Sequence, residues 1–596
     1  MNILGIHFGH DSSASLLVNG KLIGAVQEER FSRIKNYSGF PFNSVNYLLK
    51  LANIKAHEID IVAIPGSSLK TEMPFDILKE RFGYKKSPVF KLKLLLSIFL
   101  KPWTSILLYG RNKFDEFVNA EFKKKGFLNA EIVYVDHHLA HAASAFYSSP
   151  FESAIIFTQD GKGDSKSGGV YYGNGKELTV LSHQGEVDSI GQIYAEVTRY
   201  LGFLPNRHEG KITGLAANGD PSLCYGQLKE LVSKIDETIH RAELDDRNLF
   251  SHLTKNPLQV IGVLSSHPSH MKYHRNSVAL SNFFKNIFRG KTKEDISASI
   301  QSATEAWVLE WCKYNLNKMG KDKVINICLA GGLFANVKIN QVINQKTKFG
   351  GSLYVQPAMG DAGLSLGAAQ LMWHKIQSSK RMRSVEHAYL GPSYKKEYIK
   401  KIMDKFHDKI LWKSFKEIEP EIAKLLHGGK VIGRFTGGSE WGPRALGNRS
   451  ILIRPTDKKI NNQMNERLNR SEFMPFAPSV LDYRAKDYFY GYKETDVAAN
   501  FMTTTYNVVE DKIKEIEAVV HVDNTARPQI VSDKYNSSFY RLLIEYERLS
   551  GIGCLINTSF NLHEEPIVED PSDAIKALLR GAVDILALES HLIWLK

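Results

Sequence analysis

A strand, a turn that carries an acid and a glycine, and a hairpin follow one another at two places in this chain. The first copy begins with the apolar run 3–8 and has Asn19-Gly20 at its hairpin turn. The second begins with the run 154–158, continues through the turn 160–163, and has Asn174-Gly175 at its hairpin turn. Asn-Gly between alternating apolar runs is a strong hairpin signal. The repetition predicts a duplicated α/β domain with a site between its halves.

Actin-like ATPases and sugar kinases are built in this way, which sets an expectation for the fold but not for the activity. A chain of 596 residues is long enough for two or more domains. Apolar residues at spacings of three and four predict helices at 42–52 and 296–316. The sequence turns polar at 377–392, so we expect an N-terminal domain over 1–376, a linker over 377–392, and a C-terminal α/β or α+β domain over 393–596.

Two histidines and two acids form a candidate metal site. His137 and His141 are four residues apart and would share one face of a helix. Asp160 follows a strand-like run, and Asp361 opens a glycine-rich turn between a strand and a helix. Nitrogen and oxygen ligands suit Fe(II), Mn(II) or Zn(II) better than Ca(II), and Fe(II) is our first expectation. The alternative is a structural or surface pair of histidines.

Glycine-rich segments offer two candidate ligand loops in the N-terminal part. One contains Gly331, Gly332 and Asn336 after a strand-like run, and the other contains Lys211 within 209–216. Glycine lets a ligand approach the backbone closely, although a tight turn would use it equally well. Loops that shape a substrate pocket are expected within 206–300.

Arginines and amide or hydroxyl side chains gather in the C-terminal part. Arginine forks suit phosphate or carbamate oxygens, and glycines expose backbone N–H donors. Each segment alone could be a structural turn, but together they predict a pocket for an anionic ligand. The candidate residues are Arg444, Arg449, Ser450, Arg527, Gln529, Asn557 and Ser559.

A formal net charge of +13 is compatible with polyanionic partners, but a solvated lysine-rich surface explains most of it. No nucleic-acid-binding motif is present, so no nucleic-acid partner is expected. Four scattered cysteines and an N-terminus without a signal-peptide pattern indicate a cytoplasmic protein. The lysine-punctuated apolar segment 85–103 could lie on a membrane surface, but a core helix or a homodimer contact is the favoured interpretation.

These motifs resemble those of the O-carbamoyltransferase family, which includes nodulation-factor, cephem and aminoglycoside carbamoyltransferases. The resemblance extends over nearly the whole chain. It rests on Gly-Pro-Arg-Ala-Leu-Gly-Asn-Arg-Ser at 442–450 and Asn-Thr-Ser-Phe-Asn at 557–561, with support from Glu-Glu-Arg-Phe at 28–31 and Gly-Lys-x-x-Gly-Leu-Ala at 210–216. It implies an N-terminal duplicated actin-like (ASKHA-type) domain, similar to the metal-binding domain of tRNA threonylcarbamoylation. It also implies a C-terminal α/β domain similar to a carbamoyl-adenylate synthase.

The resemblance implies a reaction in two steps. ATP, with Mg, and carbamoyl phosphate yield carbamoyl-AMP, and the carbamoyl group then passes to a hydroxyl of a sugar, an antibiotic or a lipid-linked glycan. By the same resemblance His137, His141, Asp160 and Asp361 hold the metal. His10 would position or deprotonate the acceptor hydroxyl, and Lys35 would contact the carbamoyl-adenylate, although a solvated lysine is as good an interpretation.

One segment departs from the family pattern. Many relatives carry Lys-x-Arg-Glu-x-x-Arg-Pro-Phe, where this chain has Leu468, Ser471 and Met474 in place of the lysine, the glutamate and the second arginine. A sugar or metabolite kinase would also explain the repeated hairpins, but not the histidine pair or the arginine-rich C-terminal part. A non-enzymatic alternative is a scaffold or a nucleic-acid-binding protein that uses the net charge of +13. Release of pyrophosphate that requires carbamoyl phosphate would separate the transferase from both.

Overall fold

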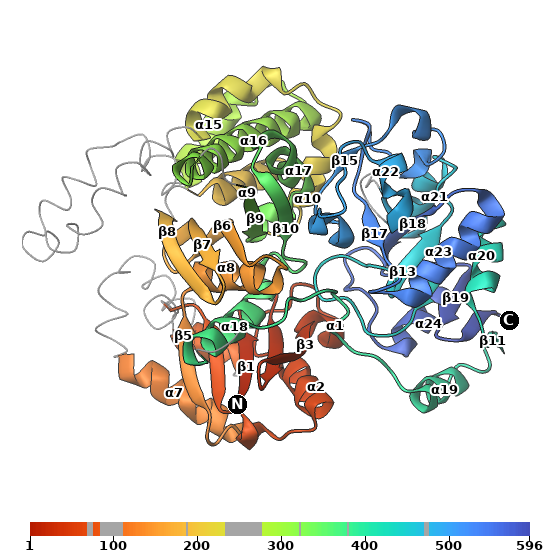
Figure 1. Cartoon of the computed structure of the whole chain (residues 1–596), viewed down its shortest axis with the longest axis horizontal. Helices are drawn as coiled ribbons and strands as arrows, with labels where there is room; N and C mark the ends of the chain where they lie inside the picture. The colour runs from red at the N-terminus through yellow and green to blue at the C-terminus, as the bar shows by residue number, and fades with distance from the viewer. Residues whose placement is uncertain are drawn as a thin grey trace, which may run out of the picture.

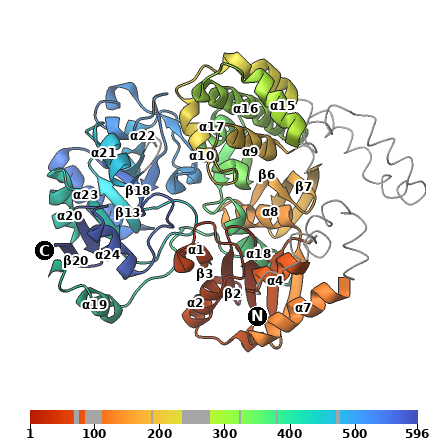
Figure 2. The ribbon, with the colours of Figure 1, turned by 180° about the vertical axis from the view of Figure 1, so that it is seen from behind.

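The computed structural model describes residues 1–67, 75–83, 111–185, 189–232, 277–320, 324–377, 381–469 and 476–596. Within these ranges the strands form three large sheets and one two-stranded pair. Two of the large sheets lie one above the other in the N-terminal part, and the third lies beside them in the C-terminal part (Figures 1 and 2).

The first sheet has the strand order β3-β2-β1-β4-β5. Its first three strands form an antiparallel meander, and the last two run parallel to β1. Alternating apolar residues and the two tight turns between them account for the meander. The strands are β1 (Asn2–His7), β2 (Ser13–Val18), β3 (Lys21–Gln27), β4 (Ile61–Pro65) and β5 (Glu131–Val135).

The second sheet repeats this arrangement. Read from its other edge, its order is β8-β7-β6-β9-β10, with an antiparallel meander followed by two strands parallel to β6. The strands are β6 (Ser153–Gly163), β7 (Lys166–Asn174), β8 (Glu177–Gly185), β9 (Ile325–Ala330) and β10 (Gly350–Val355). The predicted α/β fold with duplicated halves is therefore confirmed.

Two helices cross between the halves. α8 (His137–Ser148) follows β5 of the first sheet but packs against β6, β7 and β9 of the second. α18 (Leu364–Ile376) follows β10 of the second sheet, through the short turn η4 (Asp361–Gly363), and packs against β1, β2 and β4 of the first. The two helices also pack against each other. The helix that follows each sheet in the chain therefore packs on the sheet of the other half.

Glycines allow α18 to approach both of its neighbours closely. A Cβ atom on Gly5 of β1 would lie 1.8 Å from the carbonyl oxygen of Ser365. A Cβ atom on Gly367 of α18 would lie 1.8 Å from the carbonyl oxygen of Ala140 on α8. Neither distance is possible for a real side chain, so these two glycines set the spacing of β1, α18 and α8.

The remaining helices of the N-terminal part cover the outer faces of the two sheets. α2 packs on β2 and β3, while α9, α10, α16 and α17 belong to the layer over the second sheet. Their bounds are α1 (Glu28–Ser32), α2 (Phe42–Ala52), α4 (Phe75–Arg81), α7 (Arg111–Lys124), α9 (Ile190–Tyr200), α10 (Glu209–Ala216), α15 (Ser277–Ile287), α16 (Lys293–Lys318) and α17 (Val337–Lys346).

The third sheet has the order β11-β20-β19-β12-β13-β18-β14-β17 and is covered on both faces. Neighbouring residues such as Ile451 and Leu452 point into different hydrophobic clusters, as successive residues of a strand buried on both faces do. Its strands are β11 (Ile410–Ser414), β12 (Ile432–Phe435), β13 (Arg449–Ile453), β14 (Ala477–Leu481), β17 (Gln529–Val531), β18 (Cys554–Ser559), β19 (Ile585–Leu588) and β20 (His591–Leu595). The surrounding helices are α19 (Lys396–Asp404), α20 (Glu419–His427), α21 (Ile460–Arg467), α22 (Ala485–Tyr488), α23 (Ser537–Ser550) and α24 (Pro571–Leu579), and the two-stranded pair is β15 (Tyr506–Asn507) with β16 (Thr525–Ala526).

Direct hydrogen bonds join the third sheet's loops to the N-terminal part. Arg30 of α1 is buried and donates from Nη2 to the carbonyl oxygen of Gly442, 2.8 Å away. Arg33 donates from Nη1 to the carbonyl of Ile567 at 2.7 Å and from Nη2 to that of Pro566 at 2.8 Å. The described part of the predicted linker is packed as well, since Ser439 N donates to the carbonyl of Pro392 at 2.9 Å. The domain boundaries at 376 and 393 stay a prediction.

The predicted elements match the structure closely, with one correction. Helix 42–52 is α2, and helix 296–316 lies within α16. The predicted turn at 160–163 is wrong, because β6 continues to Gly163 through an irregular register, and the turn follows at Asp164 and Ser165 with φ of 52° and 60°. The segment 85–103, much of 206–300 and residues 470–475 lie outside the described residues.

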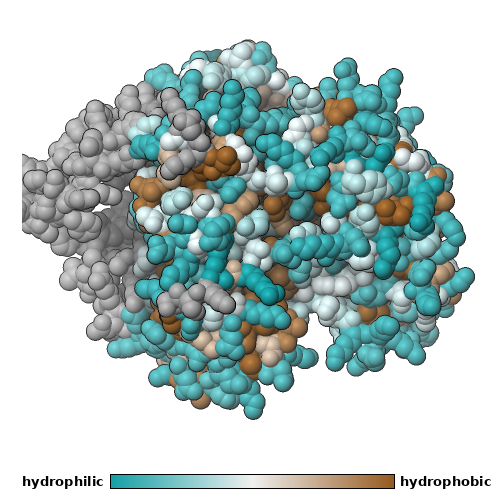
Figure 3. Space-filling view, in the orientation of Figure 1, coloured by the Kyte–Doolittle hydropathy of each residue, from teal (hydrophilic) through white to brown (hydrophobic). Residues whose placement is uncertain are grey.

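No helix in the described ranges is long and apolar enough to cross a membrane. The face shown in Figure 3 is mostly hydrophilic, with hydrophobic residues in small separate areas. All four cysteines are buried and free, as the absence of a disulfide pattern predicted.

Candidate metal and transfer site

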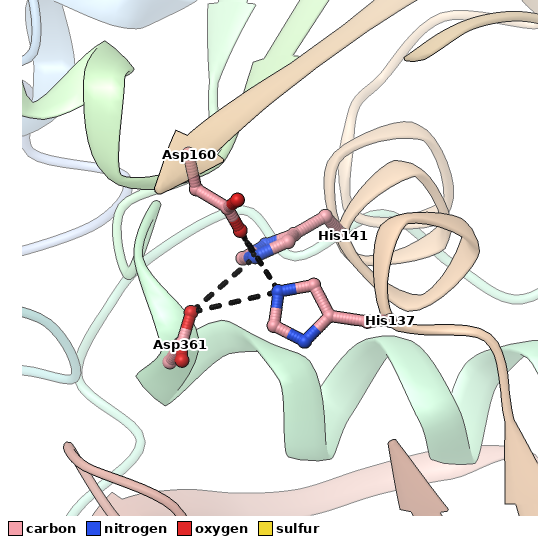
Figure 4. A group of neighbouring side chains, drawn as sticks. All are labelled: His137, His141, Asp160 and Asp361. Carbon is pink, nitrogen blue, oxygen red and sulfur yellow. Dashed lines mark hydrogen bonds and ion pairs between the residues drawn. The ribbon is translucent and has the colours of Figure 1, made fainter. Parts of the chain in front are cut away.

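His137, His141, Asp160 and Asp361 point toward a common centre (Figure 4). The two histidines lie in the first turns of α8, Asp160 lies in β6, and Asp361 lies in the η4 turn before α18. One ligand atom from each of the four side chains lies within 4.8 Å of all the others. The crossing helices thus bring together residues that are up to 224 positions apart in the chain, from 137 to 361.

The distances between these atoms fit a metal ion. Asp160 Oδ2 lies 2.8 Å from His137 Nε2 and 3.3 Å from His141 Nε2. Asp361 Oδ1 lies 3.8 Å from His137 Nε2 and 3.5 Å from His141 Nε2. Ligand atoms at about 2.1 Å from a shared tetrahedral ion lie about 3.4 Å apart, in the middle of this range.

Unpaired buried atoms support the same conclusion. Within the described residues, His141 Nε2 and Asp160 Oδ1 are buried and have no hydrogen-bond partner. Buried polar atoms are nearly always paired, so unpaired ones at a cluster of ligands indicate a missing group. Two imidazole nitrogens and two carboxylate oxygens suit a divalent ion of the Fe(II), Mn(II) or Zn(II) type.

The electrostatics of the group favour positive charge at its centre. Burial works against ionisation of Asp160 and Asp361, but the neighbouring histidines hold the pKa of each carboxyl below its usual range. Burial also lowers the pKa of His137, yet the charges of Asp160 and Asp361 outweigh it and raise that pKa to about 9. The buried carboxylate of Asp160 and the partly buried one of Asp361 therefore remain ionised and favour a cation.

His10 lies beside this group, on the turn after β1. Its Nε2 is 3.3 Å from Asp361 Oδ2, and its Nδ1 is 3.2 Å from Asp11 Oδ2. The charge of Asp361 raises the pKa of His10 to about 9. The side chain is 57% exposed, in contrast to the four candidate ligands, so it is accessible to a molecule that approaches the metal group.

The predicted glycine loop lines the same centre. Gly331 has a φ of 106°, and a Cβ atom there would lie 2.3 Å from the carbonyl oxygen of Gln159. Its N–H donates to the carbonyl of Met359 at 2.6 Å, on the turn that leads to Asp361. Gly332 is exposed, and a Cβ atom there would meet Asp160 first, at 3.9 Å. The loop leaves open backbone beside the candidate metal ligands.

Asn336, Lys211 and Lys35 are placed differently. Asn336 caps α17 by accepting from the N–H groups of Lys338 and Ile339, and its Nδ2 donates to Gln301 Oε1 at 2.7 Å, an arrangement typical of a structural residue. Lys211 lies on α10 with its ammonium 5.5 Å from the ring centre of Phe203. Lys35 lies at the seam with the C-terminal part, where its charge helps to lower the pKa of Glu564. The structure does not bring these three residues into the metal group.

The two arginines of the 442–450 motif differ in their contacts. Arg449 is fully buried and donates to the carbonyls of Thr436 at 2.7 Å and Pro392 at 2.9 Å. A guanidinium committed to backbone carbonyls is typical of an arginine that holds a loop in place. Arg444 makes no ion pair within the described ranges, and burial lowers its pKa to about 10. Arg444 is therefore the better candidate for binding an anion.

Two of the predicted residues, Gln529 and Asn557, belong to an internal hydrogen-bond network. Gln529 Oε1 accepts from Ser479 Oγ at 2.7 Å and from Asn557 Nδ2 at 2.9 Å, and Gln529 Nε2 donates to the carbonyl of Leu446 at 2.7 Å. Ser450 Oγ accepts from the N–H of Gly447 at 2.9 Å. Gln529 also lines a hollow bounded by Tyr389, Leu446, Asn500 and Asn536. Arg527 precedes β17, and Ser559 ends β18 opposite Ser450 in the ladder.

The 437–450 loop reaches the metal group through Gly442. This residue has a φ of 115°, and a Cβ atom there would lie 2.6 Å from the carbonyl oxygen of Pro357. Trp441 packs in one hydrophobic cluster with Ala358 and Ala362, on both sides of Asp361. The C-terminal part therefore contacts the turn that carries a candidate ligand.

Sequence reasoning missed three residues beside this group. His7, at the end of β1, lies with Nε2 3.0 Å from the carbonyl oxygen of His10. His138 Nε2 lies 3.6 Å from Asp160 Oδ1. Asp164 accepts from the N–H of His137 at 2.7 Å. Each lies within four positions of a residue that was singled out, so the only signal in the sequence was proximity to a motif.

Sequence comparison identifies the class of protein. The model of the family "Carbamoyltransferase N-terminus" matches residues 2–370, and that of "Carbamoyltransferase C-terminus" matches residues 423–594. These two matches cover most of the chain, including both halves of the N-terminal part and the third sheet. The chain belongs to the carbamoyltransferase family and is a carbamoyltransferase.

Proteins similar to this chain occur in several bacteria. Nodulation protein NolNO of Sinorhizobium fredii is 32% identical, over 98% of this chain and 79% of its own length. An uncharacterised protein of Synechocystis sp. is also 32% identical, over 99% of this chain and 96% of its own. Among solved structures, full-length HypF in the phosphate- and nucleotide-bound form is 15% identical, covering 64% of this chain and 47% of that chain with a TM-score of 0.31.

Proposed function

We propose that this carbamoyltransferase makes carbamoyl-AMP from ATP and carbamoyl phosphate and transfers the carbamoyl group to a hydroxyl of an acceptor. The observation that carries the proposal is the group of two histidines and two ionised carboxylates, whose spacing fits one divalent ion. It lies beside an exposed histidine and open glycine backbone, at the contact with an arginine-bearing loop of the C-terminal part.

The balance of the reaction defines what to measure. Carbamoyl phosphate and water give carbamate and phosphate. Carbamate and ATP then give carbamoyl-AMP and pyrophosphate, and the acceptor hydroxyl finally replaces AMP. Each carbamoyl group transferred therefore releases one phosphate, one pyrophosphate and one AMP, and the hydroxyl proton is lost to a base.

Different residues would serve different steps of this reaction. Arg444 offers its guanidinium to the anionic phosphate of the adenylate, as a charge placed in a buried setting does with most effect. His137, His141, Asp160 and Asp361 would hold the metal, which would polarise the carbamoyl oxygen when bound. His10 is exposed beside this group and would orient the acceptor hydroxyl.

A product assay tests the proposal. The full chain, with ATP, Mg and carbamoyl phosphate, should release pyrophosphate, and omission of carbamoyl phosphate should abolish the release. Formation of ADP and a phosphorylated metabolite would instead identify a kinase. Mass spectrometry of metabolites and surface glycans from cells with and without the protein should reveal the acceptor by one added carbamoyl group.

A further inference from the structure

Asp164 is an acid beside the metal group to which the proposed reaction gives no role. It lies in the tight turn between β6 and β7, four positions after Asp160, with a φ of 52°. Its Oδ2 atom accepts hydrogen bonds from the N–H of His137 at 2.7 Å, from the N–H of Ser67 at 2.8 Å and from Ser67 Oγ at 3.0 Å. One carboxylate oxygen thus joins three segments of the chain.

These segments come from both halves of the duplicated domain. Ser67 follows β4, and His137 opens α8 directly after β5, so both belong to the chain of the first half. Asp164 belongs to the hairpin of the second half, which also carries Asp160. The carboxylate therefore connects the backbone of one candidate metal ligand to the hairpin of another.

Two further contacts hold the same hairpin against the start of α8. Lys166 Nζ donates to Asp136 Oδ2 at 2.6 Å, and Asp136 is the N-cap of α8. A Cβ atom on Gly163 would lie 2.2 Å from the ring of His137, so the hairpin passes directly over that imidazole. A carboxylate at the first N–H of a helix also interacts favourably with the helix dipole.

We propose that Asp164 is a positioning residue of the metal site, which fixes His137 and Asp160 relative to each other across the two halves. The inference rests on the metal site of the proposed function. Ligands must be held to within about 0.5 Å for tight binding. Without the carboxylate, the hairpin and the helix N-terminus lose the one of these contacts that binds the backbone of His137 itself, and the separation of His137 Nε2 and Asp160 Oδ2, now 2.8 Å, is less tightly fixed.

Two substitutions at Asp164 change the carboxylate while keeping the backbone conformation. Asp164→Gly retains the left-handed φ without strain and removes the acceptor. Asp164→Asn tolerates the same φ and keeps one acceptor oxygen. The control is Asp220→Gly, which removes an exposed acid of the N-terminal part that accepts from Ser222 N at 2.9 Å and Ser222 Oγ at 2.7 Å.

The measurement is titration of the full-length metal-free protein with Co(II), which accepts nitrogen and oxygen ligands and reports its coordination by absorption. Urea unfolding of each metal-free variant is measured in parallel. Asp164→Gly should raise the Kd for Co(II) by about 10–100-fold, the usual effect of losing a residue that orients a ligand. Asp164→Asn and Asp220→Gly should bind Co(II) with a Kd close to that of the parent.

The outcomes distinguish the two proposals. If the parent protein binds no Co(II), the metal site itself is wrong. If the parent binds Co(II) and Asp164→Gly has the same Kd, the site stands and the positioning role is overturned. If Asp164→Asn is as weak as Asp164→Gly, an accepting oxygen at this position is not what matters, and the inference fails. A loss of stability in urea without a change in Kd would show that Asp164 has only a structural role.

Discussion

Replacement of Gly367 by alanine should weaken metal binding without touching a ligand. A Cβ atom at this position would lie 1.8 Å from the carbonyl oxygen of Ala140. An ordinary contact between carbon and oxygen is about 3.3 Å, so α8 and α18 would have to separate by about 1.5 Å. His141 lies on α8 and Asp361 directly before α18, so their ligand atoms, now 3.5 Å apart, would move to about 5 Å.

That shift exceeds what a metal site tolerates. We expect the Kd for Co(II) to rise by about 10–100-fold. The free energy of unfolding of the metal-free protein should fall by about 1–3 kcal/mol, as for other overpacked cores. Gly226→Ala is the matched control, because Gly226 is exposed on a helical segment and an added Cβ would meet nothing within 4 Å. A Gly367→Ala protein that is destabilised but binds Co(II) with the parent's Kd would refute the idea that helix spacing sets the site.

Three further outcomes are expected. His141→Ala should retain pyrophosphate release that depends on carbamoyl phosphate and lose transfer to the acceptor, so parallel loss of both in product assays would contradict the division of steps. Arg444→Gln should slow pyrophosphate release by about 100-fold without lowering the urea midpoint, because the guanidinium makes no ion pair within the described ranges; an unchanged rate would assign the anion to another residue. Burial lowers the pKa of His374 to about 4, from about 6.5 in an unfolded chain, so the unfolded state binds more protons between these values and stability falls as the pH drops through that window. His374→Gln should therefore lose less stability than the parent between pH 7 and pH 5 in urea melts, and an equal loss would place the proton uptake elsewhere.

The duplicated fold was predictable because its signals are local. Alternating apolar residues around Asn19-Gly20 and Asn174-Gly175 specify both hairpins. The spacing of His137 and His141 specifies a shared helix face, and the structure adds Asp160 and Asp361 to it. These acids could be named because each follows a strand-like run in the sequence, and the strand ends of an α/β fold converge on one site.

The roles of single polar residues were less predictable, because their partners are distant in the chain. The partners of Arg449 include Pro392 and Glu569, and no local pattern indicates such contacts. Asn336 was predicted as a ligand residue, whereas an asparagine directly before a helix is also a common N-cap. The close approach of α8 and α18 at Gly367 depends on how the two helices cross, and no pattern in a single sequence indicates that crossing.

Because α8 and α18 each pack on the sheet of the other half, a metal ion bound by the four candidate ligands would link the two halves. Opening of the two halves relative to each other would separate α8, which packs on the second sheet, from α18, which packs on the first, and would pull His141 away from Asp361. An ion that binds only the assembled group therefore holds the halves together with a free energy that grows with the concentration of free metal. Through this linkage, the metal supply around the protein would set how readily its duplicated domain opens.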